Sequence, residues 1–226
     1  GPQIHRRTLL LTAYSGPVFF HILFYYCQAL VYGTTFQHTA SQILAFTLIT
    51  LHFAKRIFET IFVHVFYRLT VSFYSLYLYL FHYWLLSGVF MAYYIYYPGT
   101  CSSSISLLSS ALETEETSLY FLSAVWIFAE LSNFETHLIL ANLRIRYPRP
   151  IPKGYGFDLV SCPNYFFELL AWTVITLITR SLASLLFLIA AGLHMWRKAA
   201  RKHEMYKKEF GSQYPKYRKV LIPYVK

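Results

Sequence analysis

Five ionisable side chains lie within a strongly apolar part of the chain, residues 51–64. His52 and Arg56 are four residues apart, so helical spacing would put them on one face. Lys55 and Glu59 are related in the same way. An ionisable side chain at mid-bilayer costs about 2.5 to 3.5 kcal/mol on insertion scales, and such residues face a bundle interior or an aqueous cavity. The pattern indicates the cationic wall of a ligand cavity.

The same side chains also have a simpler interpretation. Lys55 and Glu59 would form an internal pair that neutralises itself, while Arg56 extends toward the membrane surface. That pair leaves Arg56 and the histidines His52 and His64 unexplained, so both interpretations stay open.

A second polar segment, residues 151–168, lies between two apolar stretches. Pro152 fixes its own φ angle and favours extended backbone at the residue before it. Gly154 and Gly156 permit backbone conformations that other residues avoid. We expect a turn-rich connection here.

A helix is expected to begin directly after this connection. Pro163 suits the first helical turn, with Ser161 as its cap. Asn164 and Glu168 are four residues apart and would share one face. Tyr165 lies between them, and a tyrosine at the start of a span commonly belongs to the aromatic belt, in a chain that has 21 tyrosines.

Residues 133–144 carry polar side chains at helical spacing. Asn133 and His137 are four residues apart, and Ala141 and Arg144 continue roughly the same face. Helix capping or packing would account for Asn133 and His137 as well as ligand binding would.

Basic and aromatic residues alternate after residue 196. Ten lysines and arginines follow this position, and His203 and Tyr206 lie among them. Such a segment beside a membrane usually indicates attraction to anionic lipids.

The composition favours a membrane protein. Of the 226 residues, 56% are hydrophobic and 13% are charged, against about 25% charged in an ordinary soluble domain. The formal charge of +10 on so apolar a chain is typical of a polytopic membrane protein with basic cytoplasmic loops. The apolar stretches argue against nucleic-acid binding, the other interpretation of the positive charge.

The three cysteines and the first thirteen residues show no sign of a disulfide, a metal site or a signal peptide. Cys27, Cys101 and Cys162 show neither paired nor metal-ligand spacing, so we expect no disulfide framework and no metal site. Residues 1–13 contain too short an apolar run for a cleavable signal peptide.

We expect an all-α fold, a polytopic bundle of about six transmembrane helices in a single domain, residues 1–226. The predicted spans are 17–33, 41–66, 72–97, 118–141, 165–179 and 181–196. The fifth is short for a bilayer core, which needs about 20 apolar residues. A basic cytosolic C-terminal tail would follow residue 196.

Positive charge sets the expected orientation. Most lysines and arginines fall on one side of the predicted spans, including Arg6, Arg7, Arg68, Arg144, Arg146, Arg149 and Lys153. The opposite side holds Arg180 and a Ser-rich acidic loop, residues 98–117. Both termini are therefore expected in the cytosol.

Two of these segments carry a family resemblance. Ile-Pro-x-Gly followed by Cys162-Pro-Asn-Tyr-x-x-Glu168 resembles the signature of the very-long-chain trans-2-enoyl-CoA reductases, in the steroid 5α-reductase superfamily. The run from His52 through Lys55-Arg56 and Glu59-Thr60 to His64 is similar to a helix of the same family. The resemblance covers nearly the whole chain, and it implies that an N-terminal region of the longer members is absent here.

The resemblance implies roles for particular residues. Tyr165 would be the O–H donor to the thioester, with Lys55 and Arg56 positioning or polarising it. His52 and Glu59 would help to position the substrate. The nucleotide would be held by Asn133, His137, Arg144, Asn164, Glu168, His203 and Tyr206.

The implied reaction is reduction of a trans-2-enoyl-CoA to the saturated acyl-CoA by NADPH, in fatty-acid elongation. Hydride would go to C3, an enolate would develop on the thioester oxygen, and C2 would be protonated. No Gly-x-Gly-x-x-Gly follows a strand pattern, so side chains within the bundle must hold the cofactor. Expected partners are the acyl-CoA, membrane lipid and other elongation enzymes or membrane subunits, in the endoplasmic reticulum.

Two departures from the family leave a second hypothesis open. Phe53 stands near where related steroid reductases have a proton-donating tyrosine. Residues 70–82 are far more aromatic than the family pattern and would suit packing against another protein. The alternative is an inactive reductase homologue that serves as a structural subunit of a membrane complex, with the mitochondrial inner membrane as the other location. A steroid or polyprenol reductase is a third, weaker hypothesis.

Overall fold

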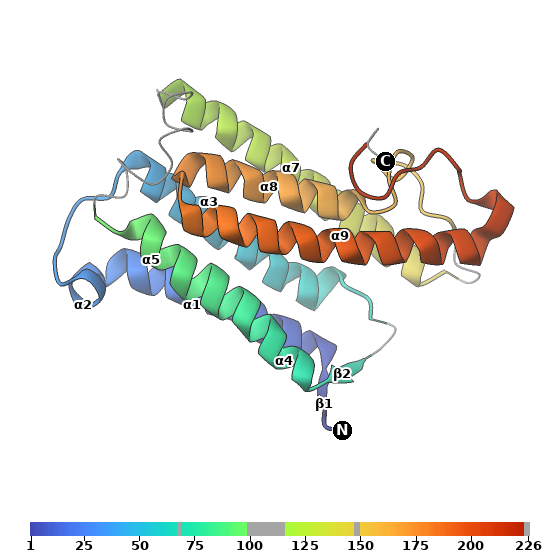
Figure 1. Cartoon of the computed structure of the whole chain (residues 1–226), viewed down its shortest axis with the longest axis horizontal. Coiled ribbons are helices and arrows are strands. Elements are labelled where there is room, and N and C mark those ends of the chain that lie inside the picture. The colour runs from blue at the N-terminus through green and yellow to red at the C-terminus, as the bar shows by residue number, and fades with distance from the viewer. Residues whose placement is uncertain (67–68, 99–115, 147–149, 224–226) are drawn as a thin grey trace. The chain divides into compact units, whose positions relative to one another are not determined.

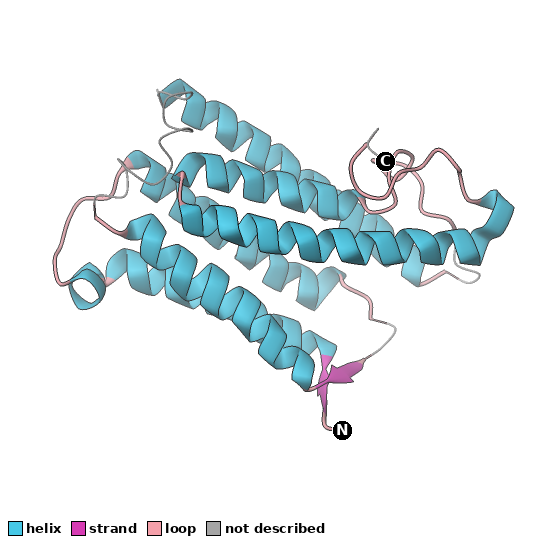
Figure 2. Ribbon diagram, viewed as in Figure 1, coloured by secondary structure: helices cyan, strands magenta, loops and turns pink. Residues whose placement is uncertain are grey.

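The computed structural model describes residues 1–66, 69–98, 116–146 and 150–223, which are mostly helical (Figures 1 and 2). The helices are α1 Arg6–Tyr26, α2 Gln28–Tyr32, α3 Ala40–Phe58, α4 Tyr74–Tyr79, α5 Met91–Tyr96, α7 Glu116–Arg144, α8 Pro163–Thr179 and α9 Leu182–Phe210. The π-helical segments are η1 Glu59–Val63 and η2 Leu80–Phe90, and η4 Gly211–Gln213 is a 3-10 turn. The predicted helical character is confirmed.

A short sheet adds to the expected all-α fold. Strands β1 Gln3–His5 and β2 Thr70–Ser72 pair antiparallel, with Gln3 opposite Ser72 and His5 opposite Thr70. This sheet is not predictable from the sequence, because two three-residue strands carry too little alternation to be recognised.

The chain packs as two compact units, Gly1–Ser123 with Val174–Phe187, and Ala124–Thr173 with Leu188–Lys226. In the first unit α1 packs against η2 and α3. A Cβ at Gly16 would overlap the indole of Trp84, whose Nε1 donates to the Thr12 carbonyl at 2.8 Å. The absence of a side chain at Gly16 is what allows α1 and η2 to approach so closely.

His21 of the first unit is a buried polar side chain with a partner on each ring nitrogen. His21 is fully buried between the Tyr96 hydroxyl, 2.7 Å from Nδ1, and the Ser87 carbonyl, 3.0 Å from Nε2. A carbonyl only accepts, so Nε2 carries the proton and Tyr96 donates to Nδ1.

The second unit is closed by residues that follow α9. Val160 and Lys219 form a parallel bridge, and Leu221 packs with Cys162 and Ala199 in a buried cluster. The last helix therefore does not end at residue 196 as predicted, and a basic cytosolic tail stays a prediction. Residues 197–210 continue α9, since Lys, Arg and Glu are good helix formers, and the chain then folds back onto the loop before α8.

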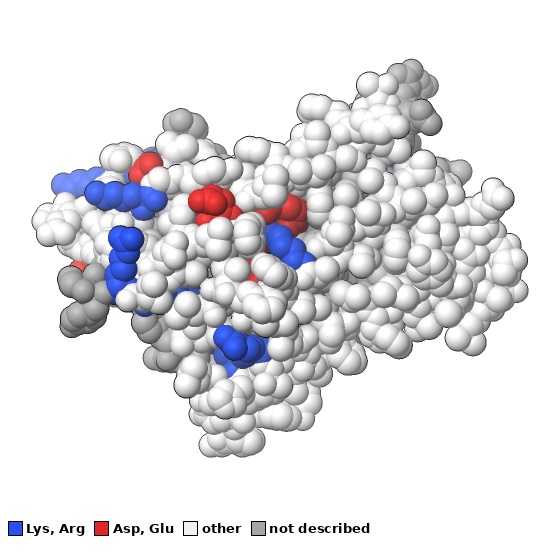
Figure 3. Space-filling model, turned by 180° about the vertical axis from the view of Figure 1, so that it is seen from behind, with Lys and Arg blue, Asp and Glu red and all other residues white. Residues whose placement is uncertain are grey.

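Three helical segments are long and apolar enough to cross a bilayer, within the part of the chain that the structure describes. They are Arg6–Tyr26, Tyr74–Tyr96 and Leu182–Gln213. Large areas of the surface in Figure 3 carry no charged side chain. These features support an integral membrane protein, whereas six spans stay a prediction, because α3 ends in two cations and α8 has only 17 residues.

The boundaries of the first predicted span need correction. The first helix begins at Arg6, eleven residues before the predicted span, and ends at Tyr26 instead of continuing to residue 33. Its start differs because Arg6 to Tyr14 lack helix breakers, although they are less apolar than the rest of the helix. Arg68, Arg149 and residues 102–110 of the expected Ser-rich loop lie outside the described residues.

Candidate active site

The helix that carries the first group of site residues has a well-defined start. Thr39 and Gln42 form a capping box at the beginning of α3. The α-helix ends at Phe58, and the π-helical η1 begins at Glu59. Such π-helical turns are frequent at functional sites, because they change the direction of side chains within one helix.

Two cations of α3 share one carboxylate. Glu59 is fully buried, and its Oε2 accepts from Nη1 of Arg56 at 2.9 Å. Lys55 Nζ lies 3.7 Å from Oε1 of the same carboxylate. The predicted Lys55–Glu59 contact is confirmed, but Arg56 is only 9% exposed and bonds to Glu59 instead of extending to the protein surface. His52 is buried on the same helix.

Tyr14 of α1 is a member of this cluster that sequence analysis missed. Its hydroxyl accepts from Arg56 Nη2 at 2.9 Å, and the guanidinium lies 5.2 Å from the centre of the Tyr14 ring. The Tyr14 ring also contacts Phe53. A buried guanidinium needs several acceptors, yet nothing in the sequence marks which of 21 tyrosines supplies one.

In the second unit, Asn133 ties α7 to the start of α8. Its Nδ2 donates to the backbone carbonyl of Asn164 at 2.8 Å, and both residues are buried. This hydrogen bond supports the packing interpretation of Asn133, and its nucleotide contact stays a prediction. His137 is buried on the same helix, and Arg144 is the partly buried last residue of α7.

The helix start predicted from Pro163 is confirmed, since α8 begins there. Asn164 and Glu168 are both buried, as expected of residues on one face, and Tyr165 is partly exposed. Asn164 Oδ1 is buried and has no hydrogen-bond partner within the described residues. An unused buried carboxamide oxygen suits an N–H or O–H donor on a ligand, such as the carboxamide or a ribose hydroxyl of a nicotinamide nucleotide.

The turn before α8 needs its glycines. Gly154 and Gly156 have φ angles of 77° and 86°, as the sequence predicts. The expectation that Ser161 caps α8 is wrong, because its hydroxyl instead contacts His203, Tyr214 and the Lys219 carbonyl.

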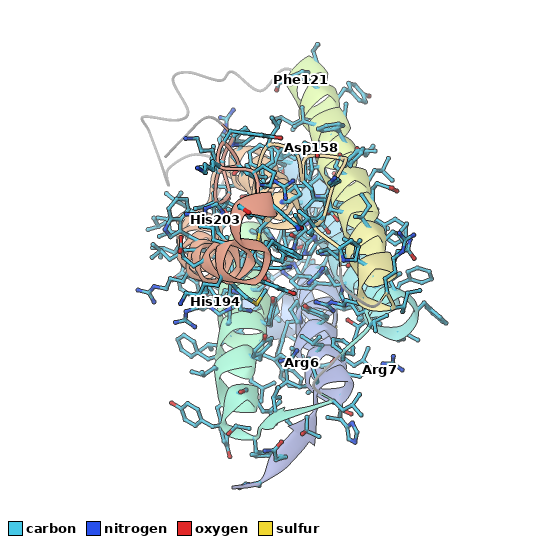
Figure 4. The ribbon with its side chains drawn as sticks, turned by 90° about the vertical axis from the view of Figure 1, so that its right-hand side faces the viewer. Arg6, Arg7, Phe121, Asp158, His194 and His203 are labelled. Carbon is cyan, nitrogen blue, oxygen red and sulfur yellow. The ribbon has the colours of Figure 1, made fainter. Side chains whose placement is uncertain are left out.

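His203 and Tyr206 lie on the charged half of α9 and are both nearly buried. His203 is labelled in Figure 4. Tyr206 and Tyr214 have ring centres 5.9 Å apart, and Lys202 Nζ lies 5.5 Å from the centre of the Tyr206 ring. The end of α9 thus forms an aromatic cluster bordered by cations.

Arg218 is a second residue that sequence analysis missed. It is 3% exposed, its guanidinium lies 5.1 Å from the centre of the Tyr214 ring, and its Nε and Nη1 have no partner among the described residues. A buried cation with unused donors fits a phosphate. Its only sequence signal was its place between Tyr214-Pro215 and Ile222-Pro223, among ten basic residues.

The predicted site residues therefore fall into two groups. His52, Lys55, Arg56 and Glu59 belong to the first unit, and those of α7, α8 and α9 belong to the second. That the two groups of residues meet around one cofactor stays a prediction.

Comparison with known proteins identifies the class. The model of the family described as 3-oxo-5-alpha-steroid 4-dehydrogenase matches residues 69–226. The chain belongs to this family, the steroid 5α-reductase superfamily.

Particular relatives match the whole chain. A Schizosaccharomyces pombe protein named as an enoyl reductase is 42% identical over 226 residues, which are 99% of this chain and 73% of that protein. The very-long-chain enoyl-CoA reductase of Dictyostelium discoideum is 36% identical over all of this chain and 72% of its own length. A Caenorhabditis elegans protein of the same enzyme name is 34% identical over all of this chain and 73% of its own. The resemblance found in the sequence is confirmed, and these relatives support an oxidoreductase.

Proposed function

We propose that the chain is an NADPH-dependent enoyl-CoA reductase that converts trans-2-enoyl-CoA to saturated acyl-CoA in fatty-acid elongation. The observation that carries the proposal is the similarity, over all of this chain and 72% to 73% of their own length, to relatives named very-long-chain enoyl-CoA reductase. Their names favour an enzyme over a structural subunit, and nothing in the described residues favours the subunit.

The proposed cofactor site is built by the second unit. Asn164 and Glu168, on one buried face of α8, would hold the nicotinamide or its ribose, and Arg218 would meet a phosphate. His137, Arg144 and Tyr206 are the other proposed contacts. When bound, NADPH supplies the hydride that this chain's side chains cannot provide.

The proposed catalytic group is the hydroxyl of Tyr165, a partly exposed residue at the start of α8. It would donate a hydrogen bond to the thioester oxygen, where negative charge grows during reduction. Lys55 and Arg56 would position the thioester, with Glu59 holding both cations in place. A donor fixed before the reaction stabilises this charge without paying for reorganisation.

The apolar helices would take the acyl chain from the bilayer, because an apolar cavity between helices suits such a ligand. The proposed location is the endoplasmic reticulum, with cytosolic termini and other elongation enzymes as neighbours.

The test is turnover by purified protein in lipid nanodiscs. We expect NADPH oxidation with a trans-2-enoyl-CoA, with saturated acyl-CoA identified by mass spectrometry, and little oxidation of NADH. Tyr165→Phe should lower kcat by at least about a hundredfold, in line with loss of a donor to a developing oxyanion. Tyr217→Phe, at a residue 67% exposed, is the matched control. A folded wild-type protein that oxidises NADPH with a polyprenal but not with an enoyl-CoA would refute the substrate assignment.

A further inference from the structure

A single hydroxyl in the second unit has three polar neighbours. Ser161 Oγ lies 2.5 Å from His203 Nδ1, 2.6 Å from the Tyr214 hydroxyl and 3.1 Å from the Lys219 carbonyl oxygen. Ser161 is fully buried, and His203 and Tyr214 are nearly so. The cluster joins the loop before α8, the charged half of α9 and the segment after η4.

The number of protons decides the direction of each hydrogen bond. Ser161 has one hydroxyl proton, and the Lys219 carbonyl oxygen can only accept. That contact is therefore a hydrogen bond only if Ser161 donates to it. Tyr214 and His203 must then both donate to Oγ, which has lone pairs for two donors. Only this arrangement turns all three contacts into hydrogen bonds.

The arrangement places a proton on Nδ1 of His203. With the proton on Nδ1, the neutral ring has a lone pair on Nε2, which can only accept. Within the part of the chain that is described, His203 forms no hydrogen bond through Nε2. The residue as a whole is 6% exposed. One ring nitrogen is thus held by the protein, and the other is left for a ligand.

We propose that Ser161 is a positioning residue that holds His203 as the Nδ1–H tautomer, so that Nε2 accepts from an O–H or N–H group of the nucleotide cofactor. A ribose hydroxyl or the carboxamide supplies such a donor. The identity of the ligand rests on the proposed function, whereas the tautomer does not.

The assignment also excludes one contact. A phosphate oxygen is an acceptor, and it cannot bond to the acceptor nitrogen of a neutral histidine. If His203 met a phosphate it would need a proton on Nε2. The ring would then be either positively charged, or neutral with Ser161 donating to Nδ1 in place of the Lys219 carbonyl. For the neutral ring, the direction of the Ser161 proton therefore decides which part of a nucleotide His203 can bind.

The first test is spectroscopic and needs no turnover. The full chain is labelled with 15N-histidine, reconstituted in nanodiscs without nucleotide, and the His203 signals are assigned by their loss in His203→Gln. We expect protonated Nδ1 and unprotonated Nε2 in the wild type and in Ser161→Thr, and a mixture of tautomers in Ser161→Ala. A wild-type His203 with the proton on Nε2 would overturn the proposal, even if Ser161→Ala fails to fold.

The second test measures NADPH binding and turnover separately. In Ser161→Ala we expect the NADPH Kd to rise about tenfold, with kcat changed less than twofold and recovery of affinity in Ser161→Thr. Ser132→Ala is the matched control, because Ser132 is equally buried in the same unit but bonds to the Tyr155 hydroxyl. Unchanged Kd in a folded Ser161→Ala variant would refute the positioning role. A wild type with the expected tautomer that binds no NADPH would instead refute the proposed function and leave the tautomer standing.

Discussion

Arg56 donates from Nη1 to Oε2 of Glu59 at 2.9 Å, and the carboxylate has no surface exposed to solvent. Removing one partner of a buried ion pair leaves an uncompensated charge, which costs about 3 to 5 kcal/mol. We therefore expect Glu59→Gln to lower the free energy of unfolding by this order, measured by thermal unfolding in one detergent. Glu204→Gln, which breaks an exposed pair with Lys207, is the control and should change stability by less than about 0.5 kcal/mol. Equal effects would mean that the buried pair adds no special stability.

Tyr14 contributes a hydroxyl as well as a ring to the Arg56 cluster. Tyr14→Phe keeps the ring but removes an acceptor from a charged donor, and such hydrogen bonds contribute about 1.5 to 3 kcal/mol. We expect a loss of stability of this size in thermal unfolding. The control is Tyr74→Phe, since Tyr74 is 67% exposed. A Tyr14→Phe variant as stable as the control would show that the ring alone holds Arg56.

Asn164 and Asn133 use their side chains differently, and substitution should separate the two roles. The Asn164 side chain has an unused buried oxygen, whereas that of Asn133 donates to the Asn164 backbone. Asn164→Ala should raise the KM for NADPH roughly three- to tenfold and leave thermal unfolding nearly unchanged, because one ligand hydrogen bond is lost. Asn133→Ala should lower stability by about 1 kcal/mol. Unchanged KM in Asn164→Ala would contradict the proposed cofactor contact.

The glycines of the turn before α8 provide a matched pair of variants. Both have positive φ, where an L side chain costs about 1 to 2 kcal/mol. A Cβ on Gly156 would also lie 2.9 Å from Pro163 Cβ, whereas one on Gly154 would meet nothing within 4 Å. We expect Gly156→Ala to be clearly less stable than Gly154→Ala in thermal unfolding. Equal stabilities would mean that the turn moves away from Pro163 without cost.

Burial raises the pKa of the Cys162 thiol from 9.0 to about 11. The folded state therefore favours the neutral thiol. The contribution of this thiol to the stability of the fold is present below pH 9 and is lost as the pH rises toward 11. At about pH 8 the thiol is neutral and covered, so N-ethylmaleimide should not label it until the protein is denatured. Intact mass in a Cys27→Ser, Cys101→Ser background measures the labelling. Rapid labelling of the native protein would contradict the buried position.

Local patterns predicted those features that depend on the helical repeat. Lys55 and Glu59 were expected to meet because they are four residues apart, and they do. The same spacing predicted the shared buried face of Asn164 and Glu168. These predictions succeed because a helix fixes such neighbours whatever else surrounds it.

Contacts between distant residues were not predictable from the sequence. Tyr14 and Arg56 are 42 positions apart, and Ser161 and Tyr214 are 53 apart. Their partners are set by how helices and loops pack, and no local pattern encodes that choice. The end of α9 was also misjudged, because the apolar run stops near residue 196 while the helix continues to Phe210.

The length of α9 has a mechanical consequence. At 1.5 Å per residue its 29 residues extend about 43 Å, more than the roughly 30 Å of a hydrocarbon core. Transmembrane helices accommodate a change of bilayer thickness by tilting, and the residues of an unbroken helix tilt together. His203 and Tyr206 would therefore share any tilt of the lipid-embedded turns. If these two residues bind the nucleotide as proposed, the acyl-chain length of the host lipids would act on nucleotide affinity as well as on membrane insertion.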